Sequence, residues 1–249
     1  MKIITIKVMI FIFLTTICLF SIVNAQTFQL QSFDGTKVKV RLAYNPALGT
    51  LAIACAKDTI YLVDYMDLDD VKILNDRFLQ VSYAKRAGSN EGLANTLLLS
   101  VDHNKLIQGI HIKSFSEYDM RNFDHIQGSL SEYQLFIVKT QLVGHDKTTY
   151  KLNLNIHDES NSERTPKTNH NYNTQLILNF DPKKNIFYST HQTIAKTFMI
   201  YNPKNQRTTK QYLNGKVPVI TIGKSSYYYI NGEWYEKGDN NYLLKSAYK

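Results

Sequence analysis

A chain of 249 residues, 43% of them hydrophobic, is long enough to bury a core without disulfides, as one large all-β domain or two small ones. The formal net charge of +8 comes from the C-terminal part, because residues 181–249 hold eleven Lys or Arg against four Asp or Glu. This basic part indicates either a solvated, lysine-rich sheet surface or a face for an anionic partner such as an acidic polysaccharide, whereas the lack of a recognised module argues against nucleic acid.

Residues 1–25 are predicted to be a cleavable signal peptide. Lys2 and Lys7 give a positive start, an uncharged stretch follows, and Val23-Asn24-Ala25 forms a small-residue cleavage site. A transmembrane helix is the alternative, but the site directly after the apolar stretch and the lack of a flanking positive stop favour cleavage. We then expect residues 26–249 to be a single exported domain without a transmembrane segment, located in the periplasm, at the outer membrane or outside the cell.

Cys55 is the only cysteine that cleavage would leave, so no internal disulfide is expected. It lies in an apolar stretch, which favours a buried small side chain over a catalytic thiol. No asparagine has Ser or Thr two positions later, so the chain carries no N-glycosylation acceptor. Together these features indicate a bacterial envelope or secreted protein.

The first hairpin shows how the strands are predicted. A two-residue Asp-Gly turn would place Leu30 opposite a lysine, whereas a three-residue loop puts Leu30 opposite Val38. The longer loop also puts Phe28 opposite Val40, so one face stays apolar. Gly35 is then expected in the left-handed region, in a bulge.

Period-two alternation recurs along the rest of the chain, and no long stretch keeps a helical period. Further strands are expected at 50–55, 59–64, 78–83, 95–101, 105–112, 133–142, 148–156, 175–180, 185–190, 196–201, 210–213 and 217–222. Residues 114–130 interrupt the pattern as a crossover, a short helix or a boundary between two sheets, and residues 157–173 are expected to form a mobile surface loop. The prediction is an all-β, antiparallel meander that forms a β-sandwich or an up-and-down barrel, with little helix.

The last hairpin is strongly aromatic. Its Asn231-Gly232 pair predicts a two-residue turn that places Tyr229 opposite Trp234. Both faces carry rings, so one is expected on the core and the other either covered or offered to a ligand. The residues we expect to stack on a sugar are Tyr227, Tyr228, Trp234 and Tyr235, with core packing as the competing explanation. The Asn-Gly-x-Trp-Tyr core is similar to one repeat of choline-binding and cell-wall-binding modules, which work as tandem arrays, whereas this chain has one copy.

No catalytic residue, metal ligand or cofactor is predicted. The seven histidines show no chelating spacing, and the adjacent pairs His145-Asp146 and His157-Asp158 would point to opposite faces of a strand. The acidic groups of residues 67–70 and 158–163 lack the pattern of a calcium loop, which favours solvated turn residues in both places. The glycine-bearing stretch 86–92 precedes a strand rather than a helix, which favours a hairpin loop over a phosphate site.

The stretch FLQVSYAKRAGSNEGLANTLLLSVDHNKLIQGIHI, residues 78–112, resembles a pattern of uncharacterised exported β-rich proteins of Bacteroidota. The resemblance extends over residues 50–112. The Ala25-Gln26 cleavage site is also similar to theirs. It implies an envelope location and brings no activity.

The function we expect is that of an exported, non-catalytic binding or structural protein of the bacterial envelope, with a glycan or another anionic envelope component as its ligand. The alternatives are an envelope hydrolase with an Asp/Glu or His site and an outer-membrane β-barrel. Two carboxylates, or a histidine with an acid, converging in one concave pocket would favour the hydrolase.

Overall fold

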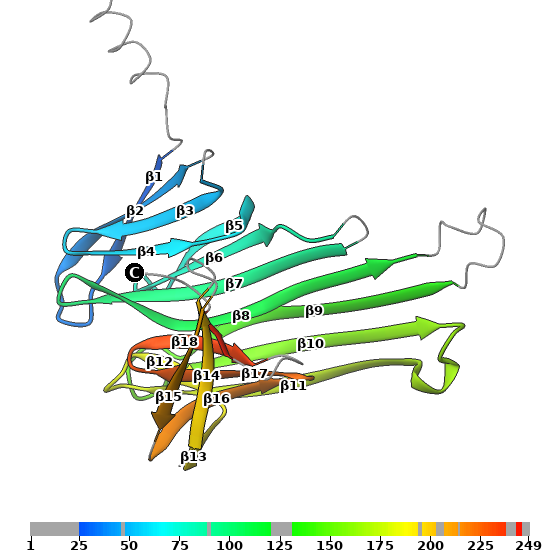
Figure 1. The fold of residues 1–249 in the computed structure, drawn as a ribbon. Coiled ribbons are helices and arrows are strands. Elements are labelled where there is room, and N and C mark those ends of the chain that lie inside the picture. Colours follow the sequence, from blue (N-terminus) through cyan, green and yellow to red (C-terminus); the bar gives the residue numbers. More distant parts are fainter. Residues whose placement is uncertain are drawn as a thin grey trace, which may run out of the picture.

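The computed structural model describes residues 25–45, 48–88, 91–120, 131–193, 196–202, 207–213, 215–237 and 243–245 (Figure 1). These ranges contain strands and one 3-10 turn at Pro166–Thr168, so the predicted all-β, antiparallel class is confirmed. The predicted signal peptide lies outside them, apart from Ala25, which begins the first strand. Within the described ranges, no helix has the length and hydropathy needed to cross a membrane.

The strands form three sheets. The first has the order β1-β2-β3-β4 and consists of β1 (Ala25–Gln31), β2 (Lys37–Asn45), β3 (Thr50–Cys55) and β4 (Asp58–Leu62). The second has the order β12-β11-β10-β9-β8-β7-β6-β5 and consists of β5 (Tyr65–Leu74), β6 (Phe78–Lys85), β7 (Glu91–Asp102), β8 (Lys105–Asp119), β9 (Glu132–Val143), β10 (Lys151–Ser162), β11 (His170–Asp181) and β12 (Ile186–Tyr188). In both sheets, strands that follow one another in the chain are neighbours, which is the predicted meander.

The third sheet contains seven described strands in the order β13-β16-β17-β18-β19-β14-β15. They are β13 (Thr190–Thr193), β14 (Lys196–Asn202), β15 (Arg207–Leu213), β16 (Lys216–Ile222), β17 (Ser225–Ile230), β18 (Glu233–Lys237) and β19 (Leu243–Lys245). Neighbouring strands are antiparallel in all three sheets except for β14 and β19, which are parallel.

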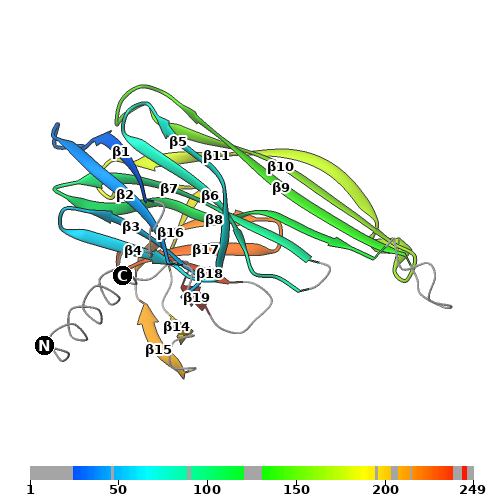
Figure 2. The same ribbon diagram turned by 90° about the horizontal axis from the view of Figure 1, so that it is seen from above.

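The outer two sheets pack on opposite faces of the eight-stranded sheet. Leu97 and Leu99 of β7 belong to one buried cluster with residues of β1–β4, whereas Leu98 belongs to a second cluster with Trp234 and Ile220 of the seven-stranded sheet. Because successive residues of a strand point to opposite faces, β7 is covered on both sides. The far ends of β8–β11 project beyond the seven-stranded sheet as an arm (Figures 1 and 2).

The first hairpin has the predicted register. Leu30 lies opposite Val38, and the amide of Ser32 donates to Thr36 O at 2.7 Å, which closes a three-residue loop. Gly35 has φ +90° and lies in the left-handed region, as expected.

Two polar stretches are strands where the sequence predicted turns or loops. Residues 157–162 continue β10 and residues 170–173 begin β11, so the predicted surface loop shrinks to the short connection between them. The acidic residues 67–70, predicted to lie in a solvated turn, belong to the edge strand β5, which contains two register shifts. In both stretches the ladder to a neighbouring strand overrides low β-propensity. Of the interrupting stretch 114–130, residues up to Asp119 extend β8, and residues 121–130 lie outside the described ranges.

Candidate functional site

The aromatic hairpin lies in the core. Tyr229 is opposite Trp234, as predicted, with 5.2 Å between the ring centroids. The four residues expected to stack on a ligand are at most 8% exposed: Tyr227 2%, Tyr228 8%, Trp234 0% and Tyr235 8%. Stacking on a sugar needs an exposed ring face, which these side chains do not offer in this structure, so packing accounts for them.

Two of these rings join the seven-stranded sheet to the eight-stranded sheet. Trp234 Nε1 donates to Gln108 O of β8 at 2.8 Å, and the amide of Lys113 on β8 donates to Tyr227 Oη at 3.1 Å. Burial raises the pKa of Tyr227, so its hydroxyl stays protonated. These bonds fix the position of the β16–β17 turn against the base of the arm.

A hollow of about 300 Å³ opens at this junction, between the arm and the β16–β17 turn. Hydroxyl, amide and charged groups line most of it, and Leu135, Phe136 and Ile222 are its apolar members. Its polar and charged side chains include Lys113, Ser116, Gln134, Asp158, His170 and Lys224. The turn lies against the arm at Gly223, where an added Cβ would be 3.9 Å from Asp158 Oδ2.

Asp158 is held by two donors from the neighbouring strand β11. His170 Nε2 lies 3.0 Å from Asp158 Oδ1, and Tyr172 Oη donates to Asp158 Oδ2 at 2.7 Å. The His170 and Tyr172 rings stack with their centroids 5.2 Å apart. Tyr172 is the direct cross-strand partner of Asp158, so the ladder between β10 and β11 creates this arrangement.

His170 meets the condition that would favour a hydrolase, because it is paired with an acid in a concave site. Its other nitrogen, Nδ1, lies 2.9 Å from the carbonyl oxygen of Thr168. A carbonyl only accepts, and Asp158 accepts at Nε2, so both ring nitrogens act as donors. These bonds, that to Asp158 first, raise the pKa of His170. Both ring nitrogens face an acceptor within the protein, so in this arrangement neither is directed at a nucleophile.

Lys113 is one of the residues that line the hollow. Its Nζ is 5.5 Å from the centroid of the Phe136 ring, which is a cation–π distance. Among the described residues, neither Lys113 nor Lys224 forms an ion pair with a carboxylate. Both ammonium groups can therefore contact a ligand in the hollow.

A second hollow of about 430 Å³ shares Lys113, Ser116 and Gln134 with the first. Its remaining lining includes Glu91, Glu117 and other residues at the ends of β7, β8 and β9. Because the two hollows have three lining residues in common, they form one elongated depression. We call this depression the arm groove.

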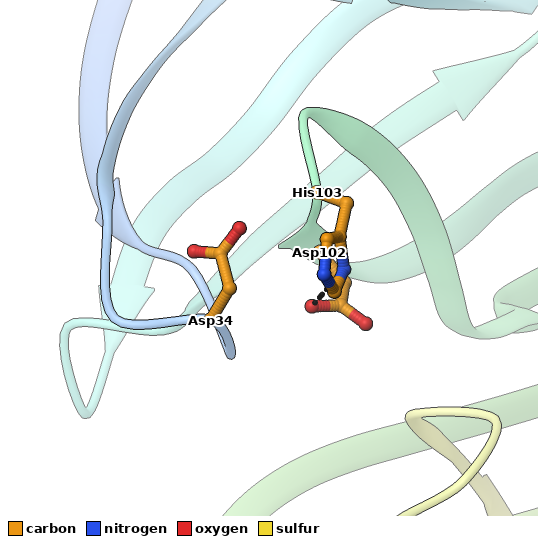
Figure 3. A group of neighbouring side chains, drawn as sticks. All are labelled: Asp34, Asp102 and His103. Atoms are coloured by element: carbon orange, nitrogen blue, oxygen red, sulfur yellow. Dashed lines mark ion pairs between the residues drawn. The ribbon is translucent and has the colours of Figure 1, made fainter.

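A separate group of side chains has the composition of a metal site. Asp34, in the turn after β1, lies near Asp102, the last residue of β7, and His103, in the turn that follows, with one potential ligand atom from each within 4.8 Å of the others (Figure 3). Asp34 Oδ1 accepts from both the amide and the hydroxyl of Thr36, which lowers its pKa to about 2. Asp102 accepts from His103 Nδ1 at 3.1 Å and from Asn185 Nδ2 at 3.3 Å. Because both carboxylates accept hydrogen bonds from neighbouring residues, these bonds explain their presence: they hold the turns in place.

The remaining sequence predictions concern single side chains. His157 pairs with Asn173, whereas the adjacent Asp158 faces His170, so this His-Asp pair diverges as predicted. Cys55, expected to be buried, is half-buried, and its thiol donates to Asn104 O at 3.0 Å.

Sequence analysis missed the arm groove. Its residues come from seven strands and two connections, and several belong to residues 157–173, for which the sequence predicts a loop. One signal was available in the sequence. Asp158 and Ser160 are two positions apart, as are His170 and Tyr172, so in two strands these polar side chains would lie on one face.

Comparison of the chain with protein-family models, with curated proteins and with solved structures found no match. The arm groove therefore has to be interpreted from its own chemistry.

Proposed function

We propose that the protein is an exported, non-catalytic binding protein of the bacterial envelope and that the arm groove binds a segment of envelope glycan. The observation that carries the proposal is the groove itself: an elongated depression with hydroxyl, amide and charged side chains and an aromatic floor at Phe136. A few polar groups around an apolar patch give a ligand site both affinity and orientation. Elongation suits a polymer chain better than a small molecule.

The non-catalytic part of the proposal is supported by the hydrogen bonding of Asp158 and His170. Both are occupied by partners within the protein, so this pair positions the groove wall and is not free to act as the base of a hydrolase. Export is supported by residues 1–25, whose charge pattern and cleavage site suit a signal peptide. The resemblance of residues 50–112 to exported proteins of Bacteroidota supports the same location.

Titration calorimetry of residues 26–249 with purified envelope polysaccharide tests binding. The Gln134→Ala variant removes an exposed amide from the middle of the groove and is expected to weaken binding about fivefold, the effect of one net hydrogen bond. Gln175→Ala, an exposed amide on β11 outside the groove, is the matched control and should bind as the parent does. Equal affinities for all three proteins would contradict the site.

Two further measurements test the other parts. Mass spectrometry of the protein recovered from the envelope should give Gln26 as its first residue, and an intact Met1 would contradict cleavage. Incubation with the bound polysaccharide should release no new reducing ends. Their appearance at a rate that depends on the protein would favour the hydrolase.

A further inference from the structure

The arm groove has opposite charges at its two ends. The part next to the ends of β7–β9 carries the carboxylates of Glu91 and Glu132. The part next to the β16–β17 turn carries Lys224, and Lys113 lies between the two. The groove is therefore acidic at one end and basic at the other.

Among the residues that the structure describes, the acidic end has no ion-pair partner. Glu91 accepts a backbone amide from Gly88, and Glu132 accepts the side-chain amide of Gln134. Within the described ranges, neither glutamate has a lysine, arginine or histidine partner. Their shared hollow concentrates negative charge, so it attracts a cationic group.

The basic end contains acids as well, but each of them is paired. Asp158 is hydrogen-bonded by His170, and Glu159 Oε2 lies 3.5 Å from His157 Nε2. This pairing leaves the ammonium group of Lys224 as the charge that the turn presents to a ligand, so this end attracts an anionic group.

The two ends are separated along the strand direction. Phe136, which lies beside the turn at Gly223, and Glu132 are four positions apart on β9, which corresponds to about 13 Å in an extended strand. A ligand that contacts both ends must therefore be an extended chain with its opposite charges on different units.

We propose that the ligand of the arm groove is a zwitterionic glycan, whose free amine lies against Glu91 and Glu132 and whose carboxylate lies against Lys224. This inference rests on the proposed function and specifies its ligand class. A ligand with both charges matches a groove that is acidic at one end although the protein as a whole is basic.

The test compares four hexasaccharides by titration calorimetry at low and at high salt. The probes are acetylated chitohexaose, which is neutral; its deacetylated form, with amines only; an oligogalacturonate, with carboxylates only; and a heparosan-type chain with alternating free glucosamine and glucuronate. We expect the last to bind at least about tenfold more tightly than the neutral probe, with an affinity that falls as salt rises.

Charge-neutralising variants assign the two ends. Glu132→Gln should weaken the amine-bearing probes about three- to tenfold and leave the oligogalacturonate unchanged, and Lys224→Gln should do the reverse. The exposed Asp69→Asn and Lys39→Gln are matched controls outside the groove and should change neither. Thermal unfolding midpoints check that all four variants are folded.

The outcomes separate this inference from the proposed function. Equal binding of the neutral and zwitterionic probes, or the same effect of both groove variants on every probe, would overturn the inference and leave glycan binding intact. Failure of all four hexasaccharides and of envelope polysaccharide to bind would overturn both.

Discussion

Acidification is expected to destabilise the fold through the buried His111. This side chain is 0% exposed, and its Nε2 lies 2.9 Å from Tyr83 Oη. Burial lowers the pKa of His111 from 6.5 to about 3, with a smaller contribution from Lys85, so the ring is neutral in the folded protein. In the unfolded chain it binds a proton below its ordinary pKa.

The magnitude follows from this difference in proton binding. Stability from His111 is fully present above pH 6.5 and is lost as the pH falls towards the folded pKa of about 3. Within that window each pH unit lowers the free energy of unfolding by about 1.4 kcal/mol. Lowering the pH from about 7.5 to about 4.5 should therefore cost about 2–3 kcal/mol through this residue.

Urea unfolding at several pH values between these limits measures the effect. The control is His111→Asn, which keeps a polar partner near Tyr83 and removes the titration. The variant should lose about 2–3 kcal/mol less than the parent protein over the same range. Identical pH dependence of the two proteins would refute the reasoning, because His111 would then titrate in the same way folded and unfolded.

Three other changes have defined outcomes. Trp234→Ala removes a fully buried ring between two sheets and should lower the free energy of unfolding by about 3–5 kcal/mol, measured by urea unfolding. Gly144→Ala should be more destabilising than Gly35→Ala in thermal unfolding: both have positive φ, but a Cβ at Gly144 would meet the backbone of the next turn, whereas at Gly35 it meets nothing within 4 Å. Asp158→Asn should lower the pKa of His170 towards 6.5, as followed by NMR titration, and an unchanged pKa would show that this carboxylate does not interact with the ring.

Alternation predicted those strands whose two faces differ. The register of Leu30 and Val38 followed from keeping one face apolar, and the Asn231-Gly232 turn determined the pairing of the last hairpin. Strands without a clear apolar face were missed. The acidic strand β5 lies at a sheet edge, and the ends of β10 and β11 carry polar groups on both faces, so long-range pairing rather than local pattern makes them strands.

The candidate site was less predictable than the fold for the same reason. Asp158 and His170 are twelve positions apart and meet only because β10 and β11 pair in one register. Lys224 reaches the arm from another sheet, and no local pattern relates it to Lys113. The aromatic residues of the last hairpin were conspicuous in the sequence because they build the contact between sheets.

The two-sided burial of β7 has a consequence for the order in which the protein folds. Leu97 and Leu99 are covered by strands made earlier in synthesis, whereas Leu98 is covered by Ile220 and Trp234, which emerge more than a hundred residues later. Until then, one face of the central sheet is an apolar surface without a cover, which invites wrong pairing and aggregation. We therefore expect this face to be most prone to wrong pairing between the synthesis of the middle of the chain and of its end.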